Sequence, residues 1–185
     1  MPKKSKSKLT DKTSYIWAIL RITLGLIMLW AFADKMFGLG NTTCLTVDPK
    51  TKAESVVIMC PKATIKGGSA TTGFLKFAAK GPMKTTYNKI AGNKIVDYTF
   101  MAGLLLIGLS LVSGIGIKIG TVSAMVMFLM MWTAVLPPEN HPFLDDHIVY
   151  LFVMLGILLS NDRQVWGLGQ WWQAKPIVKK YPLLA

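Results

Sequence analysis

Acidic residues, cysteines and histidines are all scarce in this chain of 185 residues, which contains nine Asp and Glu, two Cys and two His. Charged residues make up 16% of the chain, which is too low a share for an ordinary soluble domain. The cysteines form no Cys-x-x-Cys pair, and His141 and His147 lack the His-x-x-x-His spacing of common metal sites. The sequence therefore predicts neither a metal site nor a covalently bound cofactor.

The scarcity of acids leaves a strong positive charge, because 21 Lys and Arg residues give the chain a net charge of +12. Such a charge is typical of nucleic-acid binding. Here, however, the lysines lie in the two tails and one loop, and no aromatic residues are interleaved with them in a groove pattern. We therefore expect contact with the anionic headgroups of a lipid bilayer and no nucleic-acid partner.

Hydrophobic residues make up 52% of the chain, its mean hydropathy is +0.43, and its apolar residues are collected in blocks. Each block is near the ~20 residues that a helix needs to cross the hydrocarbon of a bilayer. The basic start of the chain resembles the n-region of a signal peptide. The apolar stretch after it is too long and lacks a cleavage site, so we expect it to stay as the first span. The predicted spans lie at about residues 15–37, 96–113, 119–136 and 143–160.

Short connections join the last three predicted spans. The glycine-rich residues 113–120 make a tight turn, and Leu136-Pro-Pro-Glu-Asn140 ends the third span because proline cannot continue a helix. Short connections place antiparallel helices side by side. Gly116, Gly120 and Ala124 then allow two of these helices to approach closely.

A large loop over residues 38–94 separates the first two spans. It contains two short β-type runs, Cys44–Val47 and Val56–Cys60, which flank a turn at Asp48–Lys52. A hairpin at this turn sets Cys44 opposite Cys60, and a disulfide that closes so short a loop contributes roughly 3 kcal/mol. The disulfide implies an oxidising compartment. The alternative is a pair of unrelated buried thiols.

Residues 73–82 of the same loop predict a short amphipathic or re-entrant helix, ended by a Gly-Pro pair. Phe74, Leu75 and Phe77 would lie in the membrane interface while the lysines between them reach the headgroups; an ordinary surface helix is the alternative. The predicted fold class is an all-α integral membrane protein. It is a single membrane domain over residues 1–185, a four-transmembrane-helix bundle with this loop between its first two helices.

Four spans place both termini on the same side of the membrane. Basic residues gather before the first span and after the last, and the positive-inside rule therefore places the termini in the cytoplasm. The acidic loop from Glu139 to Asp146 and the predicted disulfide favour an extracytoplasmic position for the other side. We expect a multi-pass protein of the cytoplasmic membrane. The basic residues are Lys3, Lys4, Lys6, Lys8 and Lys12 before the first span and Arg163, Lys175, Lys179 and Lys180 after the last.

Ionisable residues interrupt or begin the predicted spans, where a charge is costly and usually faces a bundle interior, a partner or a pathway. Because the helices alternate in direction, six of these residues come to the outer edge of the bundle, with Trp30 and Trp132 at the same level. Arg21 lies roughly 20 Å from Asp34 along the helix, nearer the inner face, where it would snorkel or pair with Asp162. The six are Asp34, Lys35, Asp97, Asp145, Asp146 and His147.

Asp145, Asp146 and His147 are consecutive, so on a helix they fan through roughly 200° and at least one faces inward. A carboxylate–imidazole pair beside an aromatic wall suits proton handling next to a quinone headgroup, because His titrates near neutrality and carboxylates relay protons. Lys35 would hold a small oxyanion. Two alternatives involve no chemistry: a salt-bridge network that locks helix order, or carboxylates that cap the start of a helix.

Leu20–Gly25 and Trp30–Lys35 together form a pattern of the kind found in the first span of a known membrane-protein family. The stretch Leu136-Pro-Pro-Glu-Asn-His-Pro-Phe-Leu-Asp-Asp-His147 is the most specific part of the match, and Gly73–Pro82, Ile90–Tyr98 and Trp166–Trp172 also fit. The chain resembles the DoxX/DoxD family from about residue 15 to 172. This resemblance implies a four-span bundle in the cytoplasmic membrane of a prokaryote. The cysteine hairpin and the very basic N-terminus are not part of the family pattern.

The best-defined relative in that family is the large membrane subunit of thiosulfate:quinone oxidoreductase, which oxidises thiosulfate to tetrathionate and passes electrons to a membrane quinone with a second, small subunit. The resemblance thus implies a redox subunit that acts on thiosulfate or a related reduced sulfur anion, with quinone as co-substrate. Asp145, Asp146 and His147 would handle protons. Lys35 would place the anion, itself held by Asp34 and Asp97.

A second hypothesis is non-catalytic: the bundle anchors or assembles a larger membrane complex, and the loop closed by the disulfide is its docking surface. Both hypotheses imply a small redox subunit or a larger complex as partner, and assembly into an oligomer is left open. A transporter is the third hypothesis. It is disfavoured because the sequence shows neither an inverted repeat nor broken helices.

Overall fold

The computed structural model describes residues 8–161 and 164–185 and is mostly helical. Three of its helices are long and apolar enough to cross a membrane, and they coincide with the first three predicted spans. The predictions at Lys3, Lys4, Lys6, Asp162 and Arg163 lie outside the described residues. The three helices are α1 (Lys8–Phe37), α3 (Lys94–Ser113) and α4 (Ile117–Val135).

The fourth predicted span corresponds to a shorter helix, α5 (Asp146–Leu159), which has 14 residues. The prediction that it begins near residue 143 was wrong. The backbone N–H groups of Phe143 and Leu144 both donate to Nδ1 of His141, at 3.1 and 3.0 Å, so this segment forms a turn. Asp145 then directly precedes the helix.

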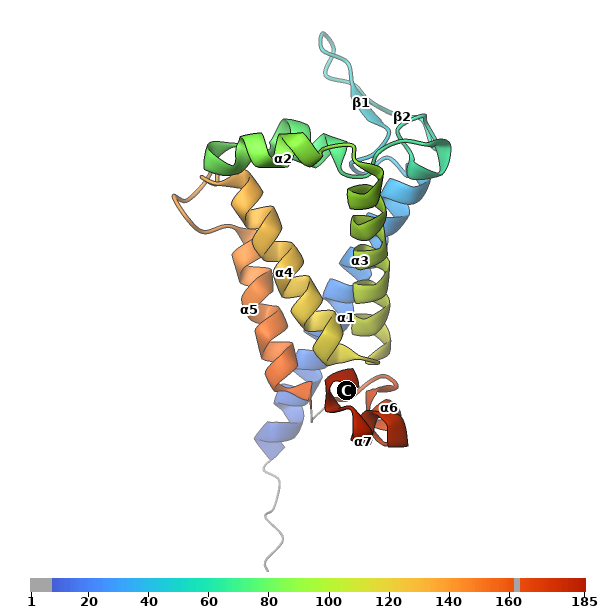
Figure 1. Cartoon of the computed structure of the whole chain (residues 1–185), viewed down its shortest axis with the longest axis vertical. Helices are drawn as coiled ribbons and strands as arrows, with labels where there is room; N and C mark the ends of the chain where they lie inside the picture. Colours follow the sequence, from blue (N-terminus) through green and yellow to red (C-terminus); the bar gives the residue numbers. More distant parts are fainter. Residues whose placement is uncertain (1–7, 162–163) are drawn as a thin grey trace, which may run out of the picture. The chain divides into compact units, whose positions relative to one another are not determined.

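The contacts of the chain divide it into two compact units, which are described separately. The first takes in the described residues of Met1–Ile27, Leu106–Leu129 and Asp146–Ala185, and the second comprises Met28–Leu105 and Met130–Asp145. Figure 1 shows the order of the helices and strands along the chain.

In the first unit, glycines bring helices into close contact. A Cβ atom added at Gly25 of α1 would lie 2.8 Å from Cγ2 of Val112 and 2.9 Å from Cβ of Leu111, both on α3. A Cβ at Gly120 of α4 would lie 2.4 Å from Oγ of Ser110 on α3. The predicted close approach is thereby confirmed at Gly120. It is not found at Gly116, which precedes α4 and where a Cβ atom would meet nothing within 4 Å.

Helix α5 belongs to the same unit and contacts two of its helices. The Trp17 side chain of α1 covers Gly156, where a Cβ atom would lie 2.2 Å from the indole. On α4, the ring of Phe128 lies 5.5 Å from that of Tyr150, between centroids. The first unit therefore contains four helical segments in contact as α1 to α3, α3 to α4, α4 to α5 and α5 to α1.

The C-terminal residues of the first unit fold into short helical turns. Residue Lys118 of α4 donates its backbone N–H to the carbonyl oxygen of Ala185 at 2.8 Å, and Nε1 of Trp172 donates to that of Leu184 at 2.6 Å. The chain end is therefore fastened to α4 and not free. The turns are α6 (Gly169–Gln173), α7 (Pro176–Lys180) and η5 (Pro182–Leu184).

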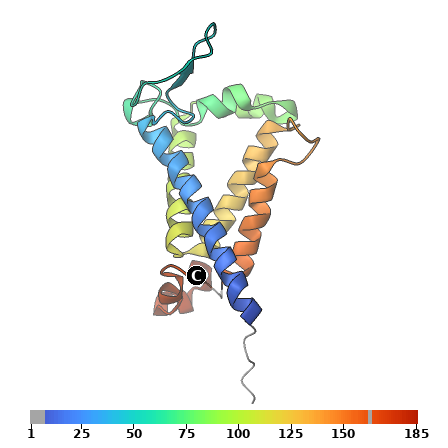
Figure 2. The ribbon, with the colours of Figure 1, turned by 180° about the vertical axis from the view of Figure 1, so that it is seen from behind.

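In the second unit, the predicted hairpin is present. Strand β1 (Leu45–Val47) pairs antiparallel with β2 (Glu54–Val56), with Leu45 opposite Val56. The hairpin stands off from the helical part of this unit in both views (Figure 1 and Figure 2). A two-stranded hairpin is at best marginally stable by itself, so its attachment at the base matters.

The Cys44–Cys60 disulfide is confirmed, with an S–S distance of 2.07 Å and Cα atoms 5.7 Å apart. The predicted register was wrong, because β2 ends at Val56 and the observed pairing sets Cys44 opposite Val57. The chain turns at Met59, whose φ is +59°. This turn carries Cys60 back to Cys44 outside the β-ladder.

The helix predicted over residues 73–82 begins at Gly73 as expected, but it ends four residues early. A π-helical turn, η2, ends at Ala78, and the Gly-Pro pair opens a further turn instead of closing the helix. Leu75 is buried with Tyr87 and Ala134, while Phe77 is exposed. The remaining elements of this loop are η1 (Thr64–Lys66), η2 (Gly73–Ala78), η3 (Gly81–Met83) and α2 (Lys84–Ile90).

Candidate functional site

Asp34, in the last turn of α1, is 1% exposed and binds the loop that follows the helix. Its Oδ1 accepts from the backbone N–H of Asn41 at 3.0 Å. Its Oδ2 accepts from the backbone N–H groups of Thr42 and Thr43 and from the Thr42 hydroxyl, at 3.2, 3.0 and 2.9 Å. Four donors therefore surround this buried carboxylate, and they hold the turn that leads into Cys44.

Asp97, in the first turn of α3, is 2% exposed and plays a similar part for the next loop segment. Its Oδ1 accepts from the backbone N–H and the hydroxyl of Thr71, at 2.9 and 2.7 Å, and from the Ser69 hydroxyl at 2.9 Å. Within the described structure, Oδ2 has no hydrogen-bond partner. The carboxylate thus fixes residues 69–71 against the start of α3.

Lys35 follows Asp34 on α1 and is half-buried. The prediction that Asp34 and Asp97 hold this lysine does not match the hydrogen bonds that the two carboxylates make. Both oxygens of Asp34 and Oδ1 of Asp97 accept hydrogen bonds from threonine and serine hydroxyls and from loop N–H groups. Lys35 is attracted to the negative charge of Asp34, and its role in placing an anion stays a prediction.

Arg21 lies in the first unit and is 2% exposed. Nη1 donates to the carbonyl oxygens of Leu111 and Val112 at the end of α3, the second at 3.2 Å. Nη2 donates to those of Val165, at 3.3 Å, and Trp166. Carbonyls in the last turn of a helix lack intrahelical partners and carry partial negative charge, so a guanidinium is well matched to this position.

The expectation that Arg21 snorkels toward headgroups was therefore wrong, since the side chain is buried against backbone carbonyls. A pair with Asp162 falls outside the described residues. Arg21 connects the end of α3 to residues 165–166, which join α5 to the C-terminal turns. Its function in the described structure is to hold these segments together.

Asp145, Asp146 and His147 present side-chain ligand atoms within 4.8 Å of one another. Nδ1 of His147 lies 3.6 Å from Oδ1 of Asp146, and the side chains are 15% and 68% exposed. The His147 ring also packs beside Phe128, with 6.5 Å between centroids. The predicted carboxylate–imidazole pair beside an aromatic ring is thus present at the start of α5.

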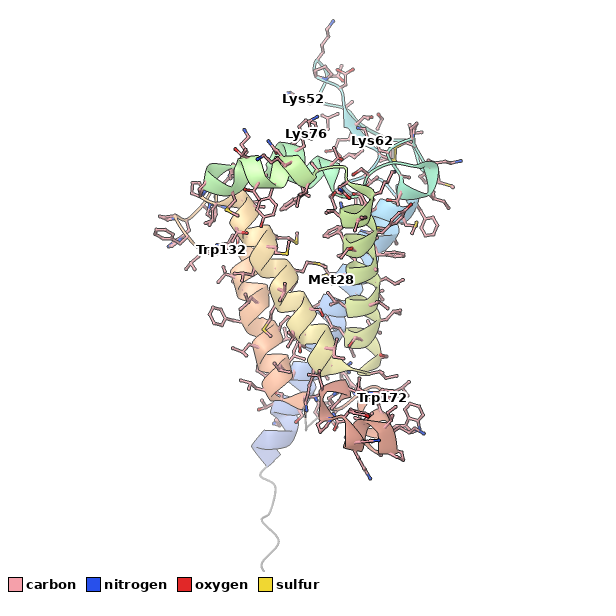
Figure 3. All side chains as sticks on the ribbon, viewed as in Figure 1. Met28, Lys52, Lys62, Lys76, Trp132 and Trp172 are labelled. Atoms are coloured by element: carbon pink, nitrogen blue, oxygen red, sulfur yellow. A yellow bond between two sulfur atoms is a disulfide. The ribbon has the colours of Figure 1, made fainter. Side chains whose placement is uncertain are left out.

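Trp132 also has a structural contact: its Nε1 donates to the carbonyl oxygen of Phe143 at 2.7 Å and ties residues 136–145 to α4. Trp30 is exposed on α1. Figure 3 labels Trp132 among the side chains of the second unit.

Sequence analysis missed the hydroxyl side chains that hold the buried carboxylates. The signal was present as two short runs, Asn41-Thr-Thr43 and Ser69-Ala-Thr-Thr72, in a loop otherwise rich in lysine. It also missed Gln164, whose buried Oε1 has no partner among the described residues and which lines a cavity of about 270 Å³ with residues 165–167, 169 and 170. Nothing in the sequence pattern singles out this glutamine.

No protein-family model matches the chain, and no curated protein or solved structure matches it significantly. Its function is accordingly argued from its own residues. Arg21, Asp34 and Asp97 bind backbone and hydroxyl groups and stabilise the fold by holding loops to helices. Asp146 and His147 form a carboxylate–imidazole pair beside an aromatic ring, an arrangement that suits proton transfer.

Proposed function

We propose that this chain is an integral membrane protein with four transmembrane helices, in which α5 is the fourth. The observation that supports the count is the ring of helix contacts in the first unit, from α1 through α3 and α4 to α5 and back to α1. At 1.5 Å per residue, the 14 residues of α5 extend about 21 Å, less than the hydrocarbon thickness of about 30 Å. Phe143 and Leu144, which are exposed and apolar, lie before the two aspartates at its start.

Reporter fusions test the count of spans. Four spans place the N- and C-termini on the same side of the membrane, in the cytoplasm by the distribution of basic residues. A reporter that is active only in the cytoplasm should therefore work at both ends of the chain. Activity at one end alone would reduce the count to three.

We further propose that the chain is a DoxX/DoxD-like membrane subunit of an oxidoreductase, which oxidises thiosulfate or a related reduced sulfur anion and passes electrons to a membrane quinone. The observation that carries this proposal is the contact of His147 with Asp146 and Phe128. An imidazole next to a carboxylate can take up the protons that move when a quinone is reduced, and an aromatic ring offers a flat surface to its headgroup. Lys35 would attract the sulfur anion.

The experiment is thiosulfate-dependent reduction of a water-soluble quinone analogue by the purified chain, with and without its native membrane partners. Asp146→Asn and His147→Gln should lower turnover by about 100-fold or more if the pair transfers protons. His141→Asn is the matched control, because this histidine only accepts from the backbone of its own turn. Full turnover by folded Asp146 and His147 variants would refute the redox proposal.

The alternative proposal is a non-catalytic anchor or assembly subunit of a larger membrane complex. One observation favours it: three buried charged residues, Arg21, Asp34 and Asp97, bind backbone and hydroxyl groups and so fix loops to helices. Their hydrogen bonds stabilise the conformation of the loops, and the groups that they bind belong to the chain itself. Absence of turnover both with and without partners, together with a stoichiometric co-purifying protein, would favour this role.

A further inference from the structure

The loop over residues 38–94 forms a cap on the second unit with an unusual distribution of charge. It contains nine lysines, no arginine and two acidic residues, Asp48 and Glu54, which leaves a net charge of +7. Within the described residues, Lys80 alone of the nine pairs with a carboxylate, that of Glu139 at 3.6 Å. The exposed lysines are Lys50, Lys52, Lys62, Lys66, Lys76, Lys84, Lys89 and Lys94.

A strip of four consecutive apolar residues, Val56–Met59, is flanked in the sequence by Lys50 and Lys52 on one side and by Lys62 and Lys66 on the other. Their exposed fractions are 46%, 61%, 64% and 43%. Four adjacent apolar side chains that remain this exposed mark an interaction surface more than ordinary surface variation. Figure 3 shows Lys52, Lys62 and Lys76 at the end of the second unit that carries the hairpin.

The strip is exposed, but its backbone is fixed. The N–H of Val57 donates to the carbonyl oxygen of Cys44 at 3.4 Å, and that of Met59 donates to Phe37 and Gly38 at 3.1 and 3.3 Å. Cys60 is held by the disulfide. A surface with a fixed backbone loses little conformational entropy when a partner covers it.

The composition of residues 38–72 bears on three kinds of partner: a membrane interface, a nucleic acid and a protein. Residues 38–72, which include the strip, contain no Trp, Tyr or Phe. Segments that lie in a membrane interface are enriched in Trp and Tyr, and segments that bind single-stranded nucleic acid present aromatic rings for stacking. An apolar centre with a charged rim is the arrangement of a protein–protein interface.

We propose that the Val56–Met59 strip and the lysines around it form the docking surface for a protein domain with an acidic face. Apolar contacts with the strip would give most of the affinity, and the lysines would steer the acidic partner toward it. The proposal extends the assembly role proposed above and requires no redox chemistry. The disulfide places this encounter in an oxidising compartment.

The test begins with a photo-crosslinking residue at Ile58 in the full chain, expressed in its native membranes, with the same residue at Ile119 on the exposed face of α4 as control. We expect Ile58 to crosslink to one protein that Ile119 does not reach. The crosslinked protein is identified, purified and titrated against the full chain in nanodiscs. Binding should weaken steeply as salt is raised.

Two variants measure the two parts of the surface. Ile58→Asp should weaken binding at least about tenfold, and Lys→Gln at residues 50, 52, 62 and 66 should slow association and reduce its salt dependence. Lys118→Gln and Lys179→Gln, in the first unit, serve as controls for the removal of lysine charge outside the second unit. Intact disulfide and unchanged thermal unfolding verify that each variant is folded.

Crosslinks to lipid alone, no crosslinked protein, or binding unaffected by Ile58→Asp and by the lysine variants would each overturn the proposal. Titration with vesicles of anionic and of zwitterionic phospholipid distinguishes a lipid surface from a protein partner. Thiosulfate-dependent turnover is measured on the same samples. A loss of docking is thereby separated from a loss of redox activity.

Discussion

Removing the Asp34 carboxylate should loosen the turn that leads into the disulfide. In Asp34→Ala, three backbone N–H groups and the Thr42 hydroxyl lose their acceptor. Hydrogen bonds to a charged group contribute about 1.5–3 kcal/mol each. Asn41 and Thr42 are exposed, so water can replace part of the hydrogen bonding that they lose, whereas Thr43 is half-buried. We therefore expect a loss of about 2–4 kcal/mol in the free energy of unfolding.

Asp34→Asn should cost about half as much, because one amide oxygen can replace Oδ2 and keep its three donors while the bond to Asn41 is lost. The measurement is denaturant-induced unfolding in detergent, followed by tryptophan fluorescence. Faster reduction of Cys44–Cys60 by an added thiol serves as the local readout.

Glu139→Gln is the control for this series, since it removes a carboxylate that makes only an exposed ion pair with Lys80. Such a pair contributes about 0–1 kcal/mol. If Asp34→Ala unfolds with the same free energy as Glu139→Gln, and the disulfide is reduced no faster, then Asp34 does not hold the turn.

Three further predictions concern packing, covalent closure and pH. Gly25→Val should destabilise the protein by about 1–3 kcal/mol because the new side chain would overlap α3. Gly73→Ala is the control and should be nearly neutral, because no atom lies within 4 Å of the new methyl group. Thermal unfolding compares the two variants. Replacing Cys60 by serine should cost roughly 3 kcal/mol, and reductant should destabilise wild type but not the variant. The N–H groups of Thr51 and Lys50 lower the pKa of Asp48 below its usual 3.8. The ionised carboxylate therefore stabilises the hairpin above that pH, and this contribution is lost as the pH falls through the lowered pKa. NMR titration of the carboxyl group measures this pKa, with Asp48→Asn as the blank.

The long apolar helices were predictable because a bilayer span imposes a length and composition that few other structures require. The start of α5 was not predictable in this way. Phe143 and Leu144 are as apolar as the helix itself, but the His141 imidazole accepts from their N–H groups. A side-chain acceptor two or three residues away thus competes with helix formation, and a hydropathy average does not register it.

The hairpin shows a different limit. Two cysteines and a turn of suitable composition were enough to predict the disulfide, but not that the chain leaves the ladder after Val56. The turn at Met59 requires a positive φ on a residue that rarely adopts it, so no sequence signal marks it. Helix α2 was missed for a simpler reason, since its seven residues carry no sustained apolar period.

Arg21, Asp34 and Asp97 are buried, and the partners that the structure shows for them are not opposite charges. Sequence reasoning pairs a buried cation with a buried anion, because opposite charges attract strongly at low dielectric. In the structure, Arg21 donates to carbonyl oxygens, whereas Asp34 and Oδ1 of Asp97 accept from N–H and hydroxyl groups. Such donors and acceptors occur in every segment of backbone, so the sequence gives little indication of which segment will supply them.

The hydrogen bonds of Asp34 and Asp97 to loop groups limit the residues that the redox hypothesis can assign to turnover. If Asp34 and Asp97 supported an anion site at Lys35, their conservative amide variants would lower turnover in proportion to that support. Because Asp34 and Oδ1 of Asp97 bind loop groups, we expect Asp34→Asn and Asp97→Asn to change stability and leave the turnover of the folded fraction within about twofold of wild type. A loss confined to Asp146 and His147 variants would then locate proton handling at the start of α5. An equal loss of turnover in the Asp34 and Asp97 variants, at unchanged stability, would support a site that includes these carboxylates. It would contradict the structural role assigned to them.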